Sequence, residues 1–210
     1  MSAPATAKRV LHIGKYFPPQ VGGMETYLHN LMHALAELNI IPCALVHQSK
    51  TSLTSIEEWF SENGSALRVV RAATWCRLLF TPISPSFPWL LHRLIKRDHP
   101  DLLHLHLPNP SAFWALALPS ARRLPWVIHW QSDVMTQRSH WLLKLAYWVY
   151  WPFESALLRK ADKVIVSSPP YLATSQPLAK IPNKCAVIPL GIKDHFSDDA
   201  RNGPTCLLYT

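Results

Sequence analysis

The stretch YFPPQVGGMETYLHNL (16–31) decides the fold, because it joins a strand-like run to a helical pattern. The run before it is RVLHIG (9–14), and Gly22 and Gly23 stand at the junction. Glycine can take positive φ, and it lets a ligand come close to the backbone. A helix that begins near Glu25 would also present free N–H groups to an anion. The junction predicts a phosphate-contacting loop, and a tight turn with a helix cap fits the spacing equally well.

Strand-like and helical patterns alternate along the rest of the chain. Further apolar runs that suit buried parallel strands lie at 40–47, 67–72, 101–107, 126–130, 162–168 and 185–191. Helical patterns lie at 24–38, 87–97, 110–123 and 139–161, the last as one helix or as two broken at Pro152. The Pro-rich segment 81–88 is expected to be a loop. The alternation predicts an α/β, Rossmann-like three-layer domain with a mainly parallel sheet of about seven strands.

The composition is that of one folded domain with a basic surface. Of 210 residues, 49% are hydrophobic, and 21 Lys and Arg face 13 Asp and Glu. A basic balance favours phosphates, an anionic membrane surface or nucleic acid as partners. Nucleic acid is not expected, because no zinc-finger, helix-turn-helix or RNA-recognition pattern is present. The four cysteines lack metal or disulfide spacing, and the first residues lack a signal-peptide core, so the expected location is cytoplasmic.

Tryptophans gather beside basic residues in the second half of the chain. The cluster consists of Trp114, Trp126, Trp130, Trp141, Trp148 and Trp151. Aromatic and cationic side chains together suit anionic headgroups, which predicts a peripheral surface that lies on the cytoplasmic face of a membrane. Taken singly, each tryptophan fits a helix position buried between sheet and solvent better, and only the cluster favours the membrane surface.

Five stretches, in order and in register, resemble the family 4 glycosyltransferases of the GT-B fold. They are RVLHIGKYFPPQVGGMETYLHNLMHALAEL (9–38), PDLLHLHLPNP (100–110), WVIHWQSDV (126–134), ADKVIVSSPPYLATS (161–175) and CAVIPLGI (185–192). The resemblance implies two Rossmann-like domains that face a cleft. The first binds the acceptor, and the second holds most of the nucleotide sugar. On this basis residues 1–195 form the first domain, and residues 196–210 form the interdomain linker and the truncated start of the second.

The resemblance also implies a function. It is that of the acceptor-binding domain of a retaining enzyme, similar to mannosyl- and rhamnosyltransferases, that transfers a hexose from a nucleotide sugar to a lipid-linked saccharide. The product would be a cell-surface polysaccharide or glycolipid, and no cofactor is expected beyond the donor substrate. The isolated chain is expected to be inactive, because most donor contacts would lie in the second domain. The alternative is a non-catalytic Rossmann-like module that binds a glycan or a membrane.

The resemblance assigns site residues by position. Gly22 and Gly23 would lie against the donor pyrophosphate, with Glu25 in the first helical turn, where an acid also simply supports a helix start. Gln131 stands where the family usually has a catalytic histidine, and it can hydrogen-bond a sugar but cannot take a charge. Asp133 would bind a hydroxyl beside it or cap a helix. The expected acceptor or sugar contacts are His106, Asn109, His129, Ser168 and Tyr171.

A metal site is the other interpretation of the histidines. His104 and His106 alternate with leucines, so on a strand they point to one face, and His129 could join them. No carboxylate or cysteine lies at supporting spacing, so no metal is expected.

Overall fold

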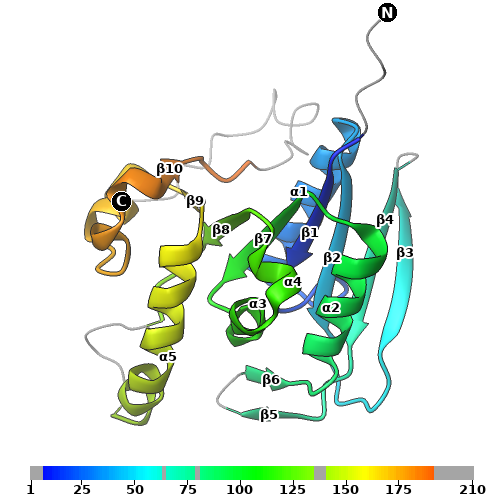
Figure 1. The fold of residues 1–210 in the computed structure, drawn as a ribbon, viewed down its shortest axis with the longest axis horizontal. Coiled ribbons are helices and arrows are strands. Elements are labelled where there is room, and N and C mark those ends of the chain that lie inside the picture. The colour runs from blue at the N-terminus through cyan, green and yellow to red at the C-terminus, as the bar shows by residue number, and fades with distance from the viewer. Residues whose placement is uncertain (1–6, 63–64, 79–80, 135–140, 192–210) are drawn as a thin grey trace, which may run out of the picture.

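A computed structural model describes residues 7–62, 65–78, 81–134 and 141–191 (Figure 1). Its main sheet has eight strands in the order β10-β9-β8-β7-β1-β2-β4-β3. The seven apolar runs are its parallel strands, as predicted, and β3 joins antiparallel at the edge. The strands are β1 (Arg9–Ile13), β2 (Ile41–His47), β3 (Ile56–Glu62), β4 (Ser65–Ala72), β7 (Leu102–Leu107), β8 (Trp126–Trp130), β9 (Lys163–Val166) and β10 (Cys185–Val187). A separate hairpin consists of β5 (Cys76–Leu78) and β6 (Thr81–Ile83).

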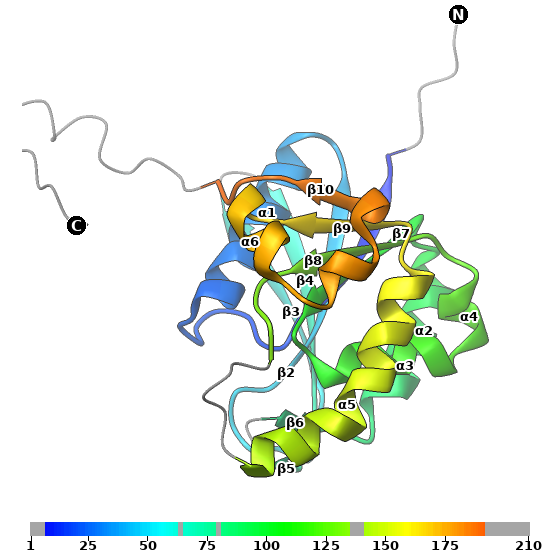
Figure 2. The same cartoon turned by 90° about the vertical axis from the view of Figure 1, so that its left-hand side faces the viewer.

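Helices cover both faces of the sheet, which gives the predicted three layers. They are α1 (Gly23–Glu37), α2 (Phe87–Asp98), α3 (Trp114–Ala117), α4 (Pro119–Arg122), α5 (Trp141–Lys160) and α6 (Pro169–Thr174), with 3-10 turns η1 (Pro110–Phe113), η2 (Leu178–Lys180) and η3 (Pro182–Lys184). Figure 2 shows α1 on one side of the sheet and α2 to α5 on the other. Leu28 and Met32 of α1 are buried against one face, where they pack with Phe17 and Val46.

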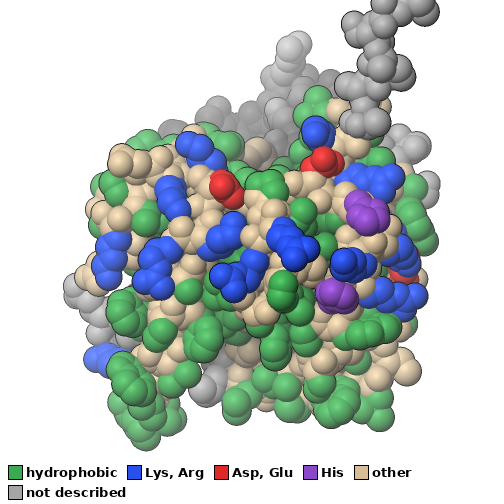
Figure 3. All heavy atoms as spheres, in the orientation of Figure 1, with side chains coloured by type: hydrophobic (Ala, Val, Ile, Leu, Met, Phe, Trp, Pro, Cys, Tyr) green, Lys and Arg blue, Asp and Glu red, His purple; other side chains and the backbone are tan. Residues whose placement is uncertain are grey.

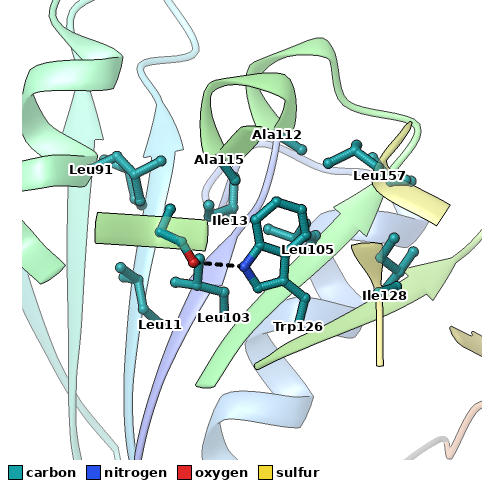
Figure 4. Packing of buried hydrophobic residues seen from close by; sticks show 14 of the residues in the cluster. Leu11, Ile13, Leu91, Leu103, Leu105, Ala112, Ala115, Trp126, Ile128 and Leu157 are labelled. Carbon is teal, nitrogen blue, oxygen red and sulfur yellow. Dashed lines mark hydrogen bonds between the residues drawn. The ribbon is translucent and has the colours of Figure 1, made fainter. Parts of the chain in front are cut away.

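The larger core lies between the sheet and the helices α2 to α5. Trp126 is fully buried there, and its indole Nε1 donates to the carbonyl of Ala121 at 2.9 Å (Figure 4). The indole therefore fills the core without leaving a polar atom unpaired. Leu157 of α5 packs into the same cluster, so the C-terminal half of α5 is fixed to the sheet.

Two local expectations differ from the structure, and of the two alternatives for segment 139–161 the single helix is the one observed. The segment 110–123 is not one helix, because Leu118 is extended (φ −90°, ψ 117°) before Pro119, and a residue before proline avoids the α conformation. The helix α5 is continuous and contains Pro152. Within the segment 81–88, residues 81–83 form the strand β6 instead of a loop.

The predicted boundary at residue 195 and the expected linker at 196–210 lie outside the described residues. Among the helices that the structure describes, none combines the length and the apolar character needed to cross a bilayer.

Candidate functional site

The loops that follow β1, β7, β8 and β9 converge at the carboxyl edge of the sheet. These strands are neighbours in the order β9-β8-β7-β1, so the residues after each strand end at one edge. In open α/β sheets this edge is where ligands bind. It carries the Gly22–Gly23 loop, Asn109, Gln131 and Ser168, so the fold brings the predicted site residues to one place.

Neither glycine of the loop lies in the left-handed region of positive φ. The backbone of Gly22 is extended at φ 172°, and Gly23 has no left-handed φ either, so that expectation was wrong. A Cβ on Gly22 would lie 2.1 Å from Oε2 of Glu25, whose buried carboxylate folds back over the loop. A Cβ on Gly23 would meet no protein atom within 4 Å. The start of α1 is therefore open to a ligand at Gly23.

Arg71 of β4 holds the preceding loop in place. Its guanidinium donates to the carbonyls of Phe17 and Pro18, and its Nε lies 2.6 Å from Oε2 of Glu58 on β3. Arg71 is only 5% exposed. A buried, charged donor that satisfies two loop carbonyls fixes the approach to Gly22.

A cationic pair beside this loop was missed from the sequence. Lys15 lies two residues after the end of β1, and Arg77 comes from the hairpin. The ring of Tyr16 lies between them, with its centroid 5.7 Å from Lys15 Nζ and 5.5 Å from the Arg77 guanidinium carbon. Burial lowers the pKa of Lys15, the carboxylate of Glu25 raises it, and Arg77 lowers it. A lysine two residues after a buried parallel strand was the available signal.

Gln131, one residue after β8, lies next to His106 on the neighbouring strand β7. Its Nε2 is 3.5 Å from Nδ1 of His106, and its backbone N–H donates to the carbonyl of Leu107 at 3.0 Å. Its Oε1 is buried and has no hydrogen-bond partner among the described residues. His129 pairs with His106 across the two strands, and its ring packs against that of Tyr27 on α1, with 4.3 Å between the centroids. Gln131 and His129 thus both contact the same histidine.

Asp133 anchors α6 to the end of β8. Its Oδ1 accepts hydrogen bonds from Trp130 Nε1 (2.8 Å), Tyr171 Oη (2.9 Å) and Ser175 Oγ (2.8 Å). Burial, followed by the hydrogen bond and charge of Asp133, raises the pKa of Tyr171 to about 12, so the phenol stays protonated and donates. The described residues give Asp133 a structural task, and its contact with a substrate stays a prediction.

Two further predicted residues act as local caps. Ser168 precedes α6, and its Oγ accepts from the backbone N–H of Tyr171 at 3.4 Å. Asn109 precedes η1, and its Oδ1 accepts from the backbone N–H of Ser111 at 3.1 Å. The Nδ2 of Asn109 is buried without a hydrogen-bond partner in the described part of the chain, so this amide can still donate.

An apolar cavity of about 570 Å³ adjoins the site between α5 and the hairpin. Lys15 and Asp133 line its polar end, and Tyr147, Tyr150 and Phe153 of α5 line its aromatic wall. Tyr147 donates to Oε2 of Glu154 at 2.8 Å, and burial raises the pKa of Glu154 to about 7. Glu154 does not line the cavity itself, and sequence reasoning missed it because nothing in the pattern of α5 shows that its partner Tyr147 faces the cavity.

Four histidines line up beneath the loops, on the α1 side of the sheet. His12 comes from β1, His104 and His106 from β7, and His129 from β8. Burial lowers the pKa of His12 to about 3 and that of His129 to about 4, and it holds the pKa values of His104 and His106 well below the usual range. All four rings are therefore neutral at physiological pH.

The glycosyl transferase 4-like domain family matches residues 22–191, most of the chain and nearly all of the elements described above. The chain belongs to this family. The match begins at Gly22, the first glycine of the loop at the carboxyl edge of the sheet.

Two named relatives are similar to this glycosyl transferase 4-like domain. The O-antigen chain mannosyltransferase C of Escherichia coli is 29% identical over 192 residues, which cover 89% of this chain and 47% of the relative. The D-rhamnosyltransferase WbpZ of Pseudomonas aeruginosa is 33% identical over 101 residues, 48% of this chain and 25% of the relative. The chain thus spans less than half the length of either relative.

Solved structures share the fold of this glycosyl transferase 4-like domain. Sucrose-phosphate synthase from Thermosynechococcus elongatus superposes with a TM-score of 0.62 at 20% identity, over 88% of this chain and 48% of that one. The catalytic domain of starch synthase IV from Arabidopsis thaliana superposes with a TM-score of 0.54 at 16% identity, over 89% of this chain and 52% of that one. Anabaena Alr3699/HepE in complex with UDP-glucose superposes with a TM-score of 0.52 at 15% identity, over 88% of this chain and 44% of that one. The fold is the Rossmann-like half-domain of a GT-B enzyme.

Proposed function

We propose that this glycosyl transferase 4-like domain is the acceptor-side half of a retaining enzyme that transfers a hexose from a nucleotide sugar to a lipid-linked saccharide. The observation that carries the proposal is the open start of α1 at Gly23, with Lys15 and Arg77 nearby and an apolar cavity beside them. Free N–H groups and cations suit a diphosphate, and the cavity suits an acceptor. The names of the mannosyl- and rhamnosyltransferase relatives support a hexose.

In the proposed mechanism, the N–H groups at the start of α1 and the ammonium of Lys15 hold the donor diphosphate. The acceptor hydroxyl attacks the anomeric carbon on the face that the diphosphate leaves. The new C–O bond forms as the bond to the diphosphate oxygen breaks, and the acceptor proton passes to that oxygen. Gln131 hydrogen-bonds the sugar without taking a proton, which this route allows because the leaving group is the base.

The acceptor would occupy the cavity between α5 and the hairpin. Phe153 and Tyr150 offer aromatic surface for a sugar ring or for apolar lipid, and Tyr147 and Glu154 offer polar atoms behind it. Five residues at or after β7, β8 and β9 stay predicted contacts to the acceptor or the sugar: His106, Asn109, His129, Ser168 and Tyr171. Their hydrogen bonds to the chain mean that they would position loops as well as touch substrate.

The activity is proposed for a protein that also supplies the second half of the two-domain fold. That complete protein, incubated with GDP-mannose, other GDP- and UDP-hexoses and a membrane fraction, is expected to release nucleotide with one donor only, and only with lipid present. The 210-residue chain alone is expected to release none above background. Turnover by the isolated chain would contradict the proposal that the second domain is needed to bind the donor. No release by the complete protein with any donor, while it still binds membrane, would favour a non-catalytic binding module.

We also propose that α5 and the hairpin rest on the cytoplasmic face of a membrane. Trp148 is 74% exposed and Leu145 57% exposed on α5, and Leu78 is exposed on the hairpin. Figure 3 shows apolar side chains along this end of the molecule and Lys and Arg side chains gathered across the face above it. Buried Trp126 and Trp130 take no part, so the tryptophan cluster of the sequence divides between core and surface.

The double substitution Trp148→Ser with Leu145→Ser is expected to weaken binding to anionic vesicles by at least about tenfold, because burying one large apolar side chain is worth about 1.5–3 kcal/mol. Vesicle co-sedimentation at fixed ionic strength measures the change. The matched control is Trp59→Ser with Leu38→Ser, exposed residues on the edge strand β3 and at the end of α1. Equal binding by both double variants would contradict the proposed membrane face.

A further inference from the structure

Three of the buried histidines share one small space, although they come from distant parts of the chain. His12 and His104 are partners across β1 and β7, and His106 follows two residues later on the same face. One ring nitrogen from each lies within 4.8 Å of the others. His12 is fully buried, His106 is 1% exposed and His104 is 6% exposed. Local spacing does not point to His12 as the third member, since it lies 94 positions from His106.

The spacing of the ring nitrogens fits a shared metal ion. Nδ1 of His12 lies 3.3 Å from Nε2 of His106. Tetrahedral ligands about 2.0–2.1 Å from zinc are about 3.3–3.4 Å apart, the same separation. A small rotation of His104 about its terminal torsion, which is a soft one, would bring its nitrogen to the same range.

The cluster has more nitrogen atoms than hydrogen-bond partners. Nε2 of His12 and Nε2 of His104 are buried and have no hydrogen-bond partner among the described residues. An unpaired buried polar atom costs about 1–3 kcal/mol, so several in one place need a reason. A bound cation could use the lone pair on Nε2 of His104, which the protein leaves idle, while the ligand atom of His12 would be its Nδ1, beside His106. Neutral imidazole is the form that binds metals.

Gln131 is placed to orient one of the ligands. With the amide turned about its last bond, Oε1 of Gln131 would face Nδ1 of His106, 3.5 Å from the present Nε2. It would then accept the Nδ1–H and leave the Nε2 lone pair free on the side of His12. A hydrogen bond of this kind at the second ring nitrogen is the usual way to fix a metal-binding histidine.

We propose that His12, His104 and His106 bind a divalent transition-metal ion of the imidazole-preferring class, with Zn²⁺ the expected ion. Three protein ligands leave a fourth position for water. The site lies at the middle of the sheet and ties β1 to β7 beneath the candidate active site. It shares His106 and Gln131 with the proposed transfer site, but metal retention is measured without donor or acceptor, so either proposal can fail without the other.

The test uses the untagged chain, stripped with a chelator, reloaded with Zn²⁺ or Co²⁺, and dialysed to remove unbound metal. We expect one Zn²⁺ retained per chain by mass spectrometry of the metal, and visible d–d absorption from tetrahedral Co²⁺ that Zn²⁺ abolishes. A folded wild-type chain that retains no Zn²⁺ and gives no visible Co²⁺ bands would overturn the site.

Variants locate the ion. His104→Asn and His12→Asn are expected to weaken Co²⁺ binding by at least about 100-fold, since even a residue behind the ligands costs about 10–100-fold. Gln131→Leu is expected to weaken Co²⁺ binding by about tenfold, because it removes the hydrogen bond that orients His106. His92→Asn is the control, because His92 is exposed on α2 and bonds Ser120. Undiminished binding by a folded His104→Asn chain would place the ion elsewhere and overturn the proposal. If the ligand variants do not fold, Gln131→Leu and the wild-type Co²⁺ spectrum decide.

Discussion

Asp133→Ala is expected to lower the free energy of unfolding by about 3 kcal/mol, because each buried donor left without an acceptor costs about 1–3 kcal/mol. Trp130 and Ser175 are each 1% exposed, so water cannot replace the lost carboxylate at either donor. Tyr171 is partly exposed and can turn to solvent. The loss should release α6 from the end of β8. Urea unfolding of the 210-residue chain, followed by tryptophan fluorescence and by circular dichroism, measures the change.

Asp133→Asn separates the structural task from a catalytic one. Asparagine keeps an oxygen that can accept from Trp130, Tyr171 and Ser175, so its cost is expected to stay below about 1.5 kcal/mol. If the complete protein with the Asp133→Asn substitution folds but transfers no sugar, Asp133 has a direct part in transfer. If Asp133→Ala were as stable as the wild type, the three hydrogen bonds could not be what holds α6.

Gly23→Ala is expected to reduce kcat/KM for the donor by about 100-fold in the complete protein, since a displacement of about 1 Å at a reacting group can cost that much. The added methyl group meets no protein atom within 4 Å, so it should not disturb the fold. Alanine at the first helical position instead stabilises by up to about 1 kcal/mol. A loss of activity with unchanged or higher Tm therefore reports contact with the donor.

Gly22→Ala is the companion variant, and its effect should have another origin. Its methyl group would lie 2.1 Å from Oε2 of Glu25, so the carboxylate must move away from the loop. Donor kinetics would then change through Glu25 and the charge near Lys15. If Gly23→Ala leaves kcat/KM for the donor unchanged, the loop is an ordinary turn, and the phosphate-contacting interpretation is wrong.

Much of the fold could be predicted because the local spacing of apolar residues indicates it. The seven parallel strands are runs that are apolar on both faces, and helices with apolar faces separate them, so chain order alone indicates an α/β sheet. The break at Leu118 was also readable, because a residue before proline avoids the α conformation. The edge strand β3 was missed, because its adjacent acids, Glu57 and Glu58, resemble a loop until Arg68 and Arg71 pair with them.

The sequence by itself determined the seven parallel strands, the glycine loop and the position of Gln131 one residue beyond β8. Only the tertiary structure decided which side chains meet. It placed β1 between β2 and β7, so that His12 joins His104, and it brought Trp130, Tyr171 and Ser175 to Asp133. The physical reason is that periodicity records which face of an element is buried. The neighbours across that face depend on the order of the crossovers, and this order joins residues that no local spacing relates.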